Sequence, residues 1–394
     1  YMFAPLEKSA TKITTILEEK HQDNISFYIY GFEEGGFVIV SADDDAYPIL
    51  GYSFTSPVSK DINSNTRFLF ERYKLEIEDA KKTKTKSTEI KKEWEKLKNK
   101  TAKKTMKAAG PLMNTIWNQS PYYNQYCPPG TPVGCVATAI SQIMKYHEWP
   151  ATGNGWYKYT PSDNPQFGEQ YADFSSVTHN YSNMPTSLSS TSSTTEKDAV
   201  ATLCYHAGVS VNMNYDTDGS GAQTKDVMYA LTSYFKYDPT SIEFVTYSLD
   251  NEAEYLNKIK NEIDNNRPIY YDGYGDAGGH AWVCDGYDDN DKVHINWGWG
   301  GSFNGFYLLS NMVAGSNDFT EGNSMIIGIK PGLADQTMLW KKQASAFTSA
   351  SRGIRYISAV DERTAWAVAY DGSGGDAGVK DFTRTIDGST WQAG

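Results

Sequence analysis

The chain has 394 residues, more than one hydrophobic core usually supports, so two or three domains are expected. It is 39% hydrophobic and 14% aromatic, which is typical of a soluble protein with sheets, turns and packed aromatic surfaces, and argues against a helical bundle. No apolar run approaches the ~18–20 residues of a membrane helix. The first residues lack a signal-peptide pattern, so either there is no secretion signal or it lies outside this sequence.

The net charge of −12 is unevenly distributed along the chain. Between Arg72 and Lys107 there are 14 basic and 6 acidic residues, a net charge of +8. Such a segment could bind nucleic acid, but glutamates are interleaved and no aromatic platform accompanies the lysines. We therefore expect it to lie against the acidic remainder of its own protein, with no nucleic-acid partner.

Residues 1–108 have the pattern of one unit. The expected elements are strands at 27–30, 36–40 and 49–52 and a helix at 66–80. A Glu-Glu-Gly-Gly turn joins the first two strands into a hairpin. Residues 81–107 are rich in Lys, Thr and Glu, and are expected to be an exposed helix or tether that is open to proteolysis.

Composition changes at residues 108–111, and a second domain is expected over 109–332. Its predicted helices are at 199–208, 224–235 and 252–265, and its predicted strands at 269–272, 280–286, 292–297, 305–309 and 324–330. Helices followed by antiparallel strands predict an α+β fold. Residues 333–394 have a short-strand rhythm ending in RTIDGSTW, which resembles the Asp-box turn of β-propeller blades. They are too few for a propeller, so we expect a β-rich C-terminal module that continues in the natural protein.

Cys135 is the first candidate for chemistry. It lies in GTPVGCVATAI, residues 130–140, where Pro and Gly precede a pattern of apolar residues with helical spacing. A cysteine in the first turn of a helix is near unpaired N–H groups and the positive end of the macrodipole, which both favour the nucleophilic thiolate. The alternative is a buried structural cysteine, and the local sequence does not decide between them.

His280 is the second candidate. It ends the glycine-rich loop DGYGDAGG and opens a predicted strand, so its side chain can face a cleft while the strand stays in the sheet. An isolated histidine is more often structural. A histidine after such a loop, far along the chain from a cysteine at a helix start, fits a catalytic Cys–His pair.

Two further segments carry candidate groups. In HINWGWGG, residues 294–301, a hairpin would return the strand beside His280, so that Asn296 or Trp297 could orient the imidazole. Packing alone is the simpler role for the tryptophans. In WNQSPYYN, the amide of Gln119 could stabilise an oxyanion together with the backbone N–H of Cys135.

The other cysteines and histidines are expected to be structural. Cys127 lies in a predicted loop and is the less favoured alternative nucleophile, whereas Cys204 and Cys284 are expected to be buried. No paired spacing of Cys or His supports a zinc site, and no metal or cofactor is expected. The histidines assigned structural roles are His147, His179, His206 and His294.

The blocks WNQSPYYN, GCVATAISQIMKYH, GGHAWVCDGYD and HINWGWGGSFNGFYLL, in that order over residues 110–331, resemble the streptopain family of papain-fold cysteine peptidases. The resemblance implies Cys135 as nucleophile, His280 as base and acid, and Gln119 in the oxyanion hole. It also implies Trp297 near His280, with adjacent Asn296 leaving that last role open. Residues 1–108 resemble the inhibitory pro-region of the same family, which implies a secreted bacterial proenzyme and virulence factor.

The expected function is therefore hydrolysis of peptide bonds in protein substrates through a thioester. The pro-region is expected to act as an intramolecular inhibitor that covers the cleft or displaces His280, and to be removed by cleavage within residues 98–113. Two alternatives stay open. One is a catalytically silent papain-fold binding or adhesion protein. The other is a different Cys-dependent amidase or acyl transferase.

Overall fold

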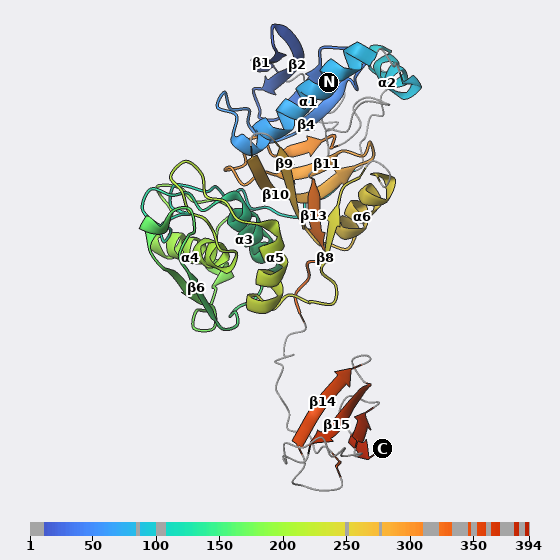
Figure 1. Cartoon of the computed structure of the whole chain (residues 1–394). Coiled ribbons are helices and arrows are strands. Elements are labelled where there is room, and N and C mark those ends of the chain that lie inside the picture. The colour runs from blue at the N-terminus through green and yellow to red at the C-terminus, as the bar shows by residue number, and fades with distance from the viewer. Residues whose placement is uncertain are drawn as a thin grey trace. The chain divides into compact units, whose positions relative to one another are not determined.

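The computed structural model describes residues 12–83, 87–99, 108–248, 252–275, 278–309, 323–332, 346–347, 353–359, 364–370, 382–385 and 391–393. The chain forms two compact units, Tyr1–Leu333 and Ala334–Gly394 (Figure 1). None of the described helices is long and apolar enough to cross a membrane.

An antiparallel sheet runs through the whole first unit. Its strands are β1 (Ile13–His21), β2 (Asn24–Phe32), β3 (Phe37–Ser41), β4 (Ile49–Ser53), β5 (Ala108–Ala109), β8 (Glu243–Thr246), β9 (Ile269–Gly275), β10 (Gly278–Asp288), β11 (Val293–Asn296), β12 (Gly305–Tyr307) and β13 (Ser324–Ile327). Their order is β1-β2-β3-β4-β12-β11-β10-β9-β13-β8, with β5 paired to β10. The N-terminal strands thus join the later strands where β4 pairs with β12, Tyr52 opposite Phe306 and Gly51 opposite Tyr307.

The N-terminal part of the unit is a β-meander covered by a helix. Alternating apolar residues of β2 and β3, such as Phe27 and Ile39, are buried against α1 (Ser64–Thr83), which contributes Phe70 and Tyr73. A second helix, α2 (Thr88–Lys98), lies in the basic segment. The predicted hairpin and long helix are confirmed. Strand β1 was not predicted, because its charged residues obscure the alternation.

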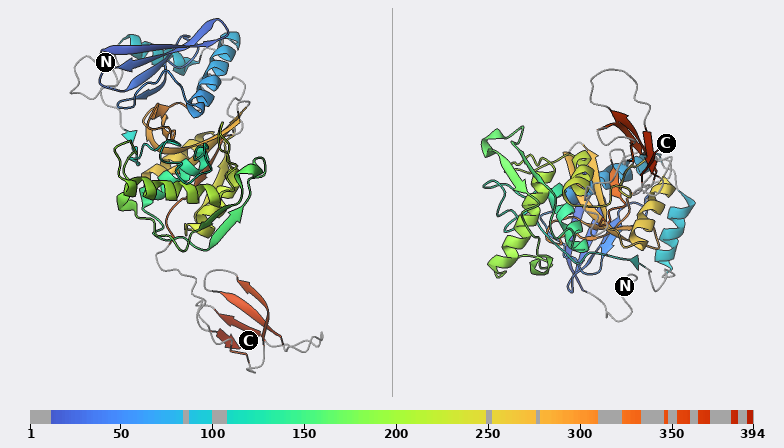
Figure 2. Two further views of the ribbon diagram at one scale, coloured as in Figure 1. Left: turned by 90° about the vertical axis from the view of Figure 1, so that its left-hand side faces the viewer. Right: turned by 90° about the horizontal axis from the view of Figure 1, so that it is seen from below.

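The helical part packs at the other end of the unit (Figure 1 and the left panel of Figure 2). It consists of α3 (Cys135–His147), α4 (Thr194–Ser210), α5 (Thr224–Tyr229) with the π-helical turn Ala230–Tyr234, the hairpin β6 (Trp156–Tyr159) and β7 (Gln170–Asp173), and the 3-10 turns Pro165–Phe167 and Tyr181–Asn183. Ser193 and Glu196 form a capping box that starts α4. The predicted helix over 224–235 therefore exists, but its last turn is wider than an α-helix.

The two faces of the sheet pack against different helices. Ala281 and Val283 of β10 belong to the core around α3, whereas Trp282 and Cys284 belong to the core around α1 and α6 (Glu252–Asp264). Alternate residues of a strand point to opposite faces, so even-numbered positions of β10 face α1 and odd-numbered positions face α3.

The second unit contains a four-stranded antiparallel sheet in the order β14-β15-β16-β17. The strands are β14 (Gly353–Ala359), β15 (Ala365–Tyr370), β16 (Phe382–Thr385) and β17 (Trp391–Ala393). The predicted β-rich character is confirmed. The Asp-box-like turn over residues 386–390 lies outside the described residues.

Two buried histidines predict a loss of stability in acid. The rings of His179 and His206 meet at 5.3 Å, and burial lowers their pKa values to about 3 and about 4, although Asp173 opposes the shift at His206. Both rings are neutral when folded but protonate below the ordinary value of 6.5 when unfolded. Stability is therefore complete above pH 6.5 and falls as the pH drops toward 4.

Between pH 7 and pH 5 the loss should be on the order of 2 kcal/mol per ring. Urea unfolding followed by tryptophan fluorescence at several pH values measures it. A His179→Leu, His206→Leu double variant should give a flatter dependence on pH. If the double variant keeps the same slope as the wild type, these two rings are not the source of the acid sensitivity.

Candidate active site

Cys135 is the first residue of α3, as predicted. Gly134 precedes it with a φ of 90°, a left-handed conformation that favours glycine. A Cβ on Gly134 would lie 2.7 Å from Met213 Sδ and 2.8 Å from the Ser220 carbonyl oxygen. The glycine thus lets the chain turn sharply into the helix, leaving the partly buried Cys135 side chain at its N-terminus.

The sulfur of Cys135 lies next to β10. Burial raises the pKa of the Cys135 thiol, while hydrogen bonds from the backbone of Ala281, Val136 and Cys135 itself oppose the increase. Burial has the larger effect, so the thiol is neutral in this state. Because Ala281 directly follows His280, the sulfur contacts the histidine's immediate neighbour in the chain.

The side chain of His280 points toward α1 rather than toward the Cys135 thiol. It is an even-numbered residue of β10, paired with Gly273 of β9, and its ring makes an edge contact with Phe68 of α1 at 5.9 Å. Burial lowers the pKa of His280, which keeps the imidazole neutral. Among the described residues no hydrogen bond joins the His280 ring to Cys135 Sγ. The structure therefore brings the two residues to the same part of the fold but on different faces of β10.

Asn65 connects α1 to the strands around His280. Its side chain is fully buried, and its Nδ2 donates hydrogen bonds to the Ala281 carbonyl oxygen at 2.9 Å and to the Trp297 carbonyl oxygen at 3.2 Å. Together with Phe68, it anchors the first turns of α1 on the residues that flank His280. Sequence reasoning missed both residues, because more than 200 positions separate each from its partner.

Gln119 lies in an extended segment beside the residues that lead into Cys135. Val133 N–H donates to the Gln119 carbonyl oxygen at 3.1 Å, which fixes this segment against the loop before the helix. The side chain is 7% exposed, and its amide makes no hydrogen bond with another described residue. An amide in this state is available to donate to a bound group.

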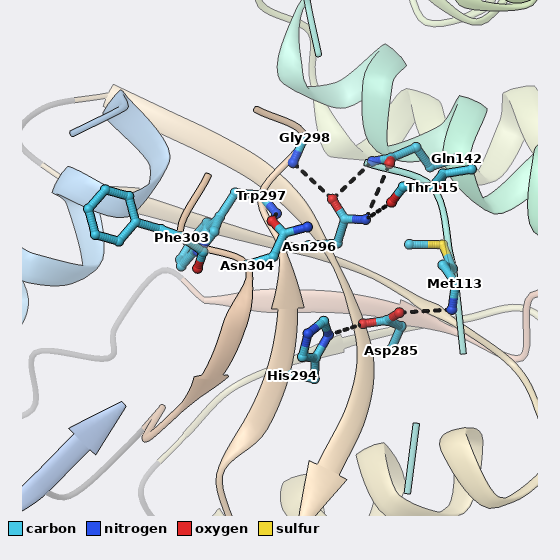
Figure 3. Close-up of polar contacts among 10 residues, drawn as sticks. All are labelled: Met113, Thr115, Gln142, Asp285, His294, Asn296, Trp297, Gly298, Phe303 and Asn304. Atoms are coloured by element: carbon cyan, nitrogen blue, oxygen red, sulfur yellow. Dashed lines mark hydrogen bonds and ion pairs between the residues drawn. The ribbon is translucent and has the colours of Figure 1, made fainter. Parts of the chain in front are cut away.

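The side chains of Asn296 and Trp297 make hydrogen bonds to groups other than His280 (Figure 3). The indole N–H of Trp297 donates to the Phe303 carbonyl oxygen at 3.0 Å, and its ring packs 5.2 Å from that of Trp282. The Asn296 amide contacts Thr115, Gln142 and Gly298. Among the described residues, no hydrogen bond joins either side chain to the imidazole, and the Trp297 ring packs on Trp282, two residues after His280 in β10.

The remaining cysteines and histidines are in structural environments. Burial raises the pKa values of Cys127 and Cys204 to about 12, and also raises that of Cys284. His294 pairs with Asp285 at 2.6 Å, and the same carboxylate accepts the Met113 N–H at 3.0 Å (Figure 3). Among the described residues, three side chains lie close enough together to bind a metal ion: Asp43, Asp44 and Asp45. They are in the loop after β3, far along the chain from Cys135.

In this α+β fold a cysteine begins a buried helix, the neighbouring strand carries a histidine, and an N-terminal helix covers that strand. This arrangement defines a papain-like cysteine peptidase in its proenzyme form. The chain belongs to the streptopain-type Peptidase C10 family, which matches residues 117–307, and the Spi protease inhibitor family matches residues 4–77.

Relatives and solved structures agree with this assignment. Streptopain of Streptococcus pyogenes is 33% identical over 338 residues, which is 78% of this chain and 81% of streptopain. The thiol protease/hemagglutinin PrtT of Porphyromonas gingivalis is 29% identical over 82% of this chain, but only 39% of that protein is matched. A prointerpain A fragment from Prevotella intermedia superposes with a TM-score of 0.66 at 28% identity, covering 82% of this chain and 100% of the fragment. The predicted α+β fold, the enzyme class and the zymogen character are confirmed.

Proposed function

We propose that this protein is a secreted bacterial endopeptidase that cleaves protein substrates with Cys135 as nucleophile, His280 as base and acid, and Gln119 as oxyanion donor. The observation that carries this proposal is the position of Cys135 as the first residue of α3, packed against the core cluster that includes Ala281, one residue from His280. A thiol at a helix N-terminus beside a histidine strand is the arrangement that thiolate catalysis needs. Export is tested by looking for the processed enzyme in culture medium.

The reaction proceeds through a thioester. The Cys135 thiolate attacks the substrate carbonyl carbon, and the oxyanion accepts hydrogen bonds from the Gln119 amide and the Cys135 backbone N–H. The His280 imidazolium gives its proton to the leaving amine. The imidazole then takes a proton from the water that attacks the thioester, and collapse of the tetrahedral intermediate expels the Cys135 thiolate, which restores the thiolate–imidazolium pair. Trp297 packs on Trp282, two residues after His280 in β10, with ring centroids 5.2 Å apart.

The same proposal assigns the parts of the chain. Residues 1–108 are the inhibitory pro-domain with its basic tether, 109–332 the peptidase domain, and 333–394 the start of a β-rich module. The edge contact of Phe68 with His280 and the two hydrogen bonds of Asn65 support displacement of His280 as the inhibitory mechanism. Activation then requires a cut within residues 98–113, of which 100–107 lie outside the described residues.

Gln119→Ala tests the oxyanion assignment. One oxyanion donor typically contributes ~3–4 kcal/mol to lowering the barrier, so kcat of the activated enzyme should fall by roughly a hundredfold or more. Hydrolysis of denatured casein, normalised to the thiol titrated by a covalent inhibitor, measures the change. Gln125→Ala is the matched control, since Gln125 lies in the same region with its amide on Asp198 at the surface.

Unchanged turnover in Gln119→Ala would remove Gln119 from the mechanism. The thiol titration, with cell-wall peptides as a second substrate beside casein, addresses the two other classes of function. A protein whose thiol is titrated but which cleaves no protein, only cell-wall peptides, is an amidase. One whose thiol does not react at all is a binding protein with a papain fold.

A further inference from the structure

Helix α3 buries one large amide side chain, that of Gln142, among mostly apolar neighbours. The Gln142 side chain is fully buried, two turns after Cys135, and its Oε1 accepts the Trp117 backbone N–H at 3.1 Å. The same oxygen accepts Asn296 Nδ2 at 3.2 Å, and Gln142 Nε2 donates to Asn296 Oδ1 at 3.3 Å (Figure 3). Two amides thus bond each other reciprocally, and one of them also holds the main chain just before Gln119.

Asn296 completes the connection from the other side. Its Nδ2 donates to the Thr115 carbonyl oxygen at 2.7 Å, and its Oδ1 accepts the Gly298 N–H at 3.1 Å (Figure 3). Both lone-pair sites and both N–H groups of this side chain are therefore used. A buried amide that lost such partners would be strongly disfavoured, so the pair fixes one arrangement of everything bonded to it.

The pair joins three segments that the proposed chemistry needs together. These are α3 with Cys135, the extended segment 115–119 with Gln119, and the turn at 296–298 that carries Trp297. Residues 115–119 lie outside the helices and strands, and residues 297–298 follow the end of β11 at Asn296. Gly298, with a φ of 73°, lies against the first turn of α3, where a Cβ would be 3.0 Å from Thr138 Cγ2.

None of these hydrogen bonds involves a residue of the N-terminal region. They connect residues 115–142 with 296–298, all on the far side of the expected activation cut. Removal of the pro-domain therefore leaves the pair in place, unlike the contacts of Asn65 and Phe68.

We propose that Gln142 and Asn296 are positioning residues that hold the oxyanion segment and the Trp297 turn on the nucleophile helix. This inference rests on the proposed roles of Cys135 and Gln119. Asn296 then supports catalysis by holding Gln142 and the main chain around Gln119, rather than by a hydrogen bond to His280. Loss of the pair moves Gln119 relative to the sulfur and leaves the sulfur itself in position.

The test compares two reactions of the same thiol. Peptide hydrolysis needs the oxyanion donor, whereas alkylation by iodoacetamide forms no oxyanion and needs only the thiolate. Full-length variants are activated by brief trypsin treatment of the lysine-rich tether, and trypsin is then quenched with a serine-protease inhibitor. Gln142→Met, close in size but without polar hydrogen-bonding atoms, should lower kcat roughly 30-fold while KM and the alkylation rate change less than about threefold.

Ser141→Ala is the matched control, as Ser141 is the adjacent fully buried polar residue of α3 outside this network. It should leave kcat, KM and alkylation unchanged. Asn296→Asp is a second variant in case Gln142→Met does not fold. It keeps the acceptor for Gly298 N–H but loses the donors to Thr115 and Gln142, and should show the same split between kcat and alkylation.

A double variant separates positioning from general damage. In the Gln119→Ala background, Gln142→Met should lower kcat by less than about threefold, because its effect passes through Gln119. Equal losses in alkylation and hydrolysis, or a full 30-fold loss in that background, would overturn the positioning role. If Gln119→Ala alone is fully active, the proposed function fails at Gln119. Failure of the proposed function is therefore seen in Gln119→Ala, whereas failure of the inference is seen in the variants of Gln142 and Asn296.

Discussion

Substitution of Cys135 by alanine is expected to lower the rate of peptide hydrolysis by ~10⁴-fold or more, because no thioester can form without the sulfur. Serine at this position should be similarly inactive, since a hydroxyl is far less acidic than a thiol and does not form an ion pair with the same imidazole. The fold should persist, as the Cβ and the glycine-led turn into α3 remain. Casein hydrolysis by trypsin-activated protein measures the loss, and a thermal scan should show a Tm within about 3 °C of the wild type.

Cys127→Ala and Cys204→Ala are the controls for this prediction. Both thiols are buried with pKa values raised to about 12, so they stay protonated and unreactive near neutral pH. These variants should keep their catalytic rate per titrated thiol. Activity that survives in Cys135→Ala and disappears in Cys127→Ala would move the nucleophile to the loop cysteine.

The second large effect is latency. The intact chain should be at least ~100-fold less active than the chain cut within residues 98–113. Catalysis needs the imidazole on the face of β10 that packs against α3, because the Cys135 sulfur lies on that face. In the proenzyme the ring lies on the α1 side, against Phe68, and Asn65 donates to the carbonyl oxygens of Ala281 and Trp297. Activity of cleavage-resistant full-length protein measures this difference.

Variants of α1 test whether these two side chains cause the latency. Asn65→Ala combined with Phe68→Ala should give an uncut chain with at least ~10-fold more activity than the uncut wild type. Leu75→Ala, at an exposed position of the same helix, should not. If the uncut wild type is already as active as the cut enzyme, displacement of His280 is not inhibitory.

The pH dependence of thiol alkylation follows from the same contacts. In the intact chain burial raises the pKa of Cys135 and lowers that of His280, so both are neutral and alkylation should increase only on the alkaline side. After the cut, a nearby imidazolium stabilises the thiolate and the midpoint should move to lower pH. An identical midpoint in both forms would show that the pair does not form on activation.

The pairing of β4 with β12, which joins the pro-domain strands to the peptidase strands, is short enough to break when the pro-domain is removed. Among the described residues, Gly51 and Tyr52 of β4 pair with β12, and Leu308 N–H just after β12 donates to the Leu50 carbonyl oxygen at 2.9 Å. The Tyr52 hydroxyl also donates to the buried Asp288 carboxylate at 2.9 Å. Departure of the pro-domain therefore breaks a short ladder and leaves β12, three residues long, as the new edge. Short edge strands offer little template for aggregation.

Much of the site and fold was readable from local pattern. The start of α3 at Cys135 followed from the glycine before it and the apolar spacing after it, and the strand after His280 followed from its residue types. The longer antiparallel strands of residues 109–332 were also placed correctly, but the short strands β5, β6, β7 and β8 were not predicted. Those four have at most four residues each, too few to produce a recognisable alternation.

The sequence by itself therefore determined which elements carry the candidate catalytic residues, because helix and strand periodicity is a local property. Only the tertiary structure decided which face of β10 the imidazole occupies, that α1 holds it there, and that the Asn296 amide bonds Gln142 instead of His280. Each of these depends on contacts between residues more than 150 positions apart. Such contacts form when the hydrophobic faces of separate elements pack together, and no spacing within one element encodes them.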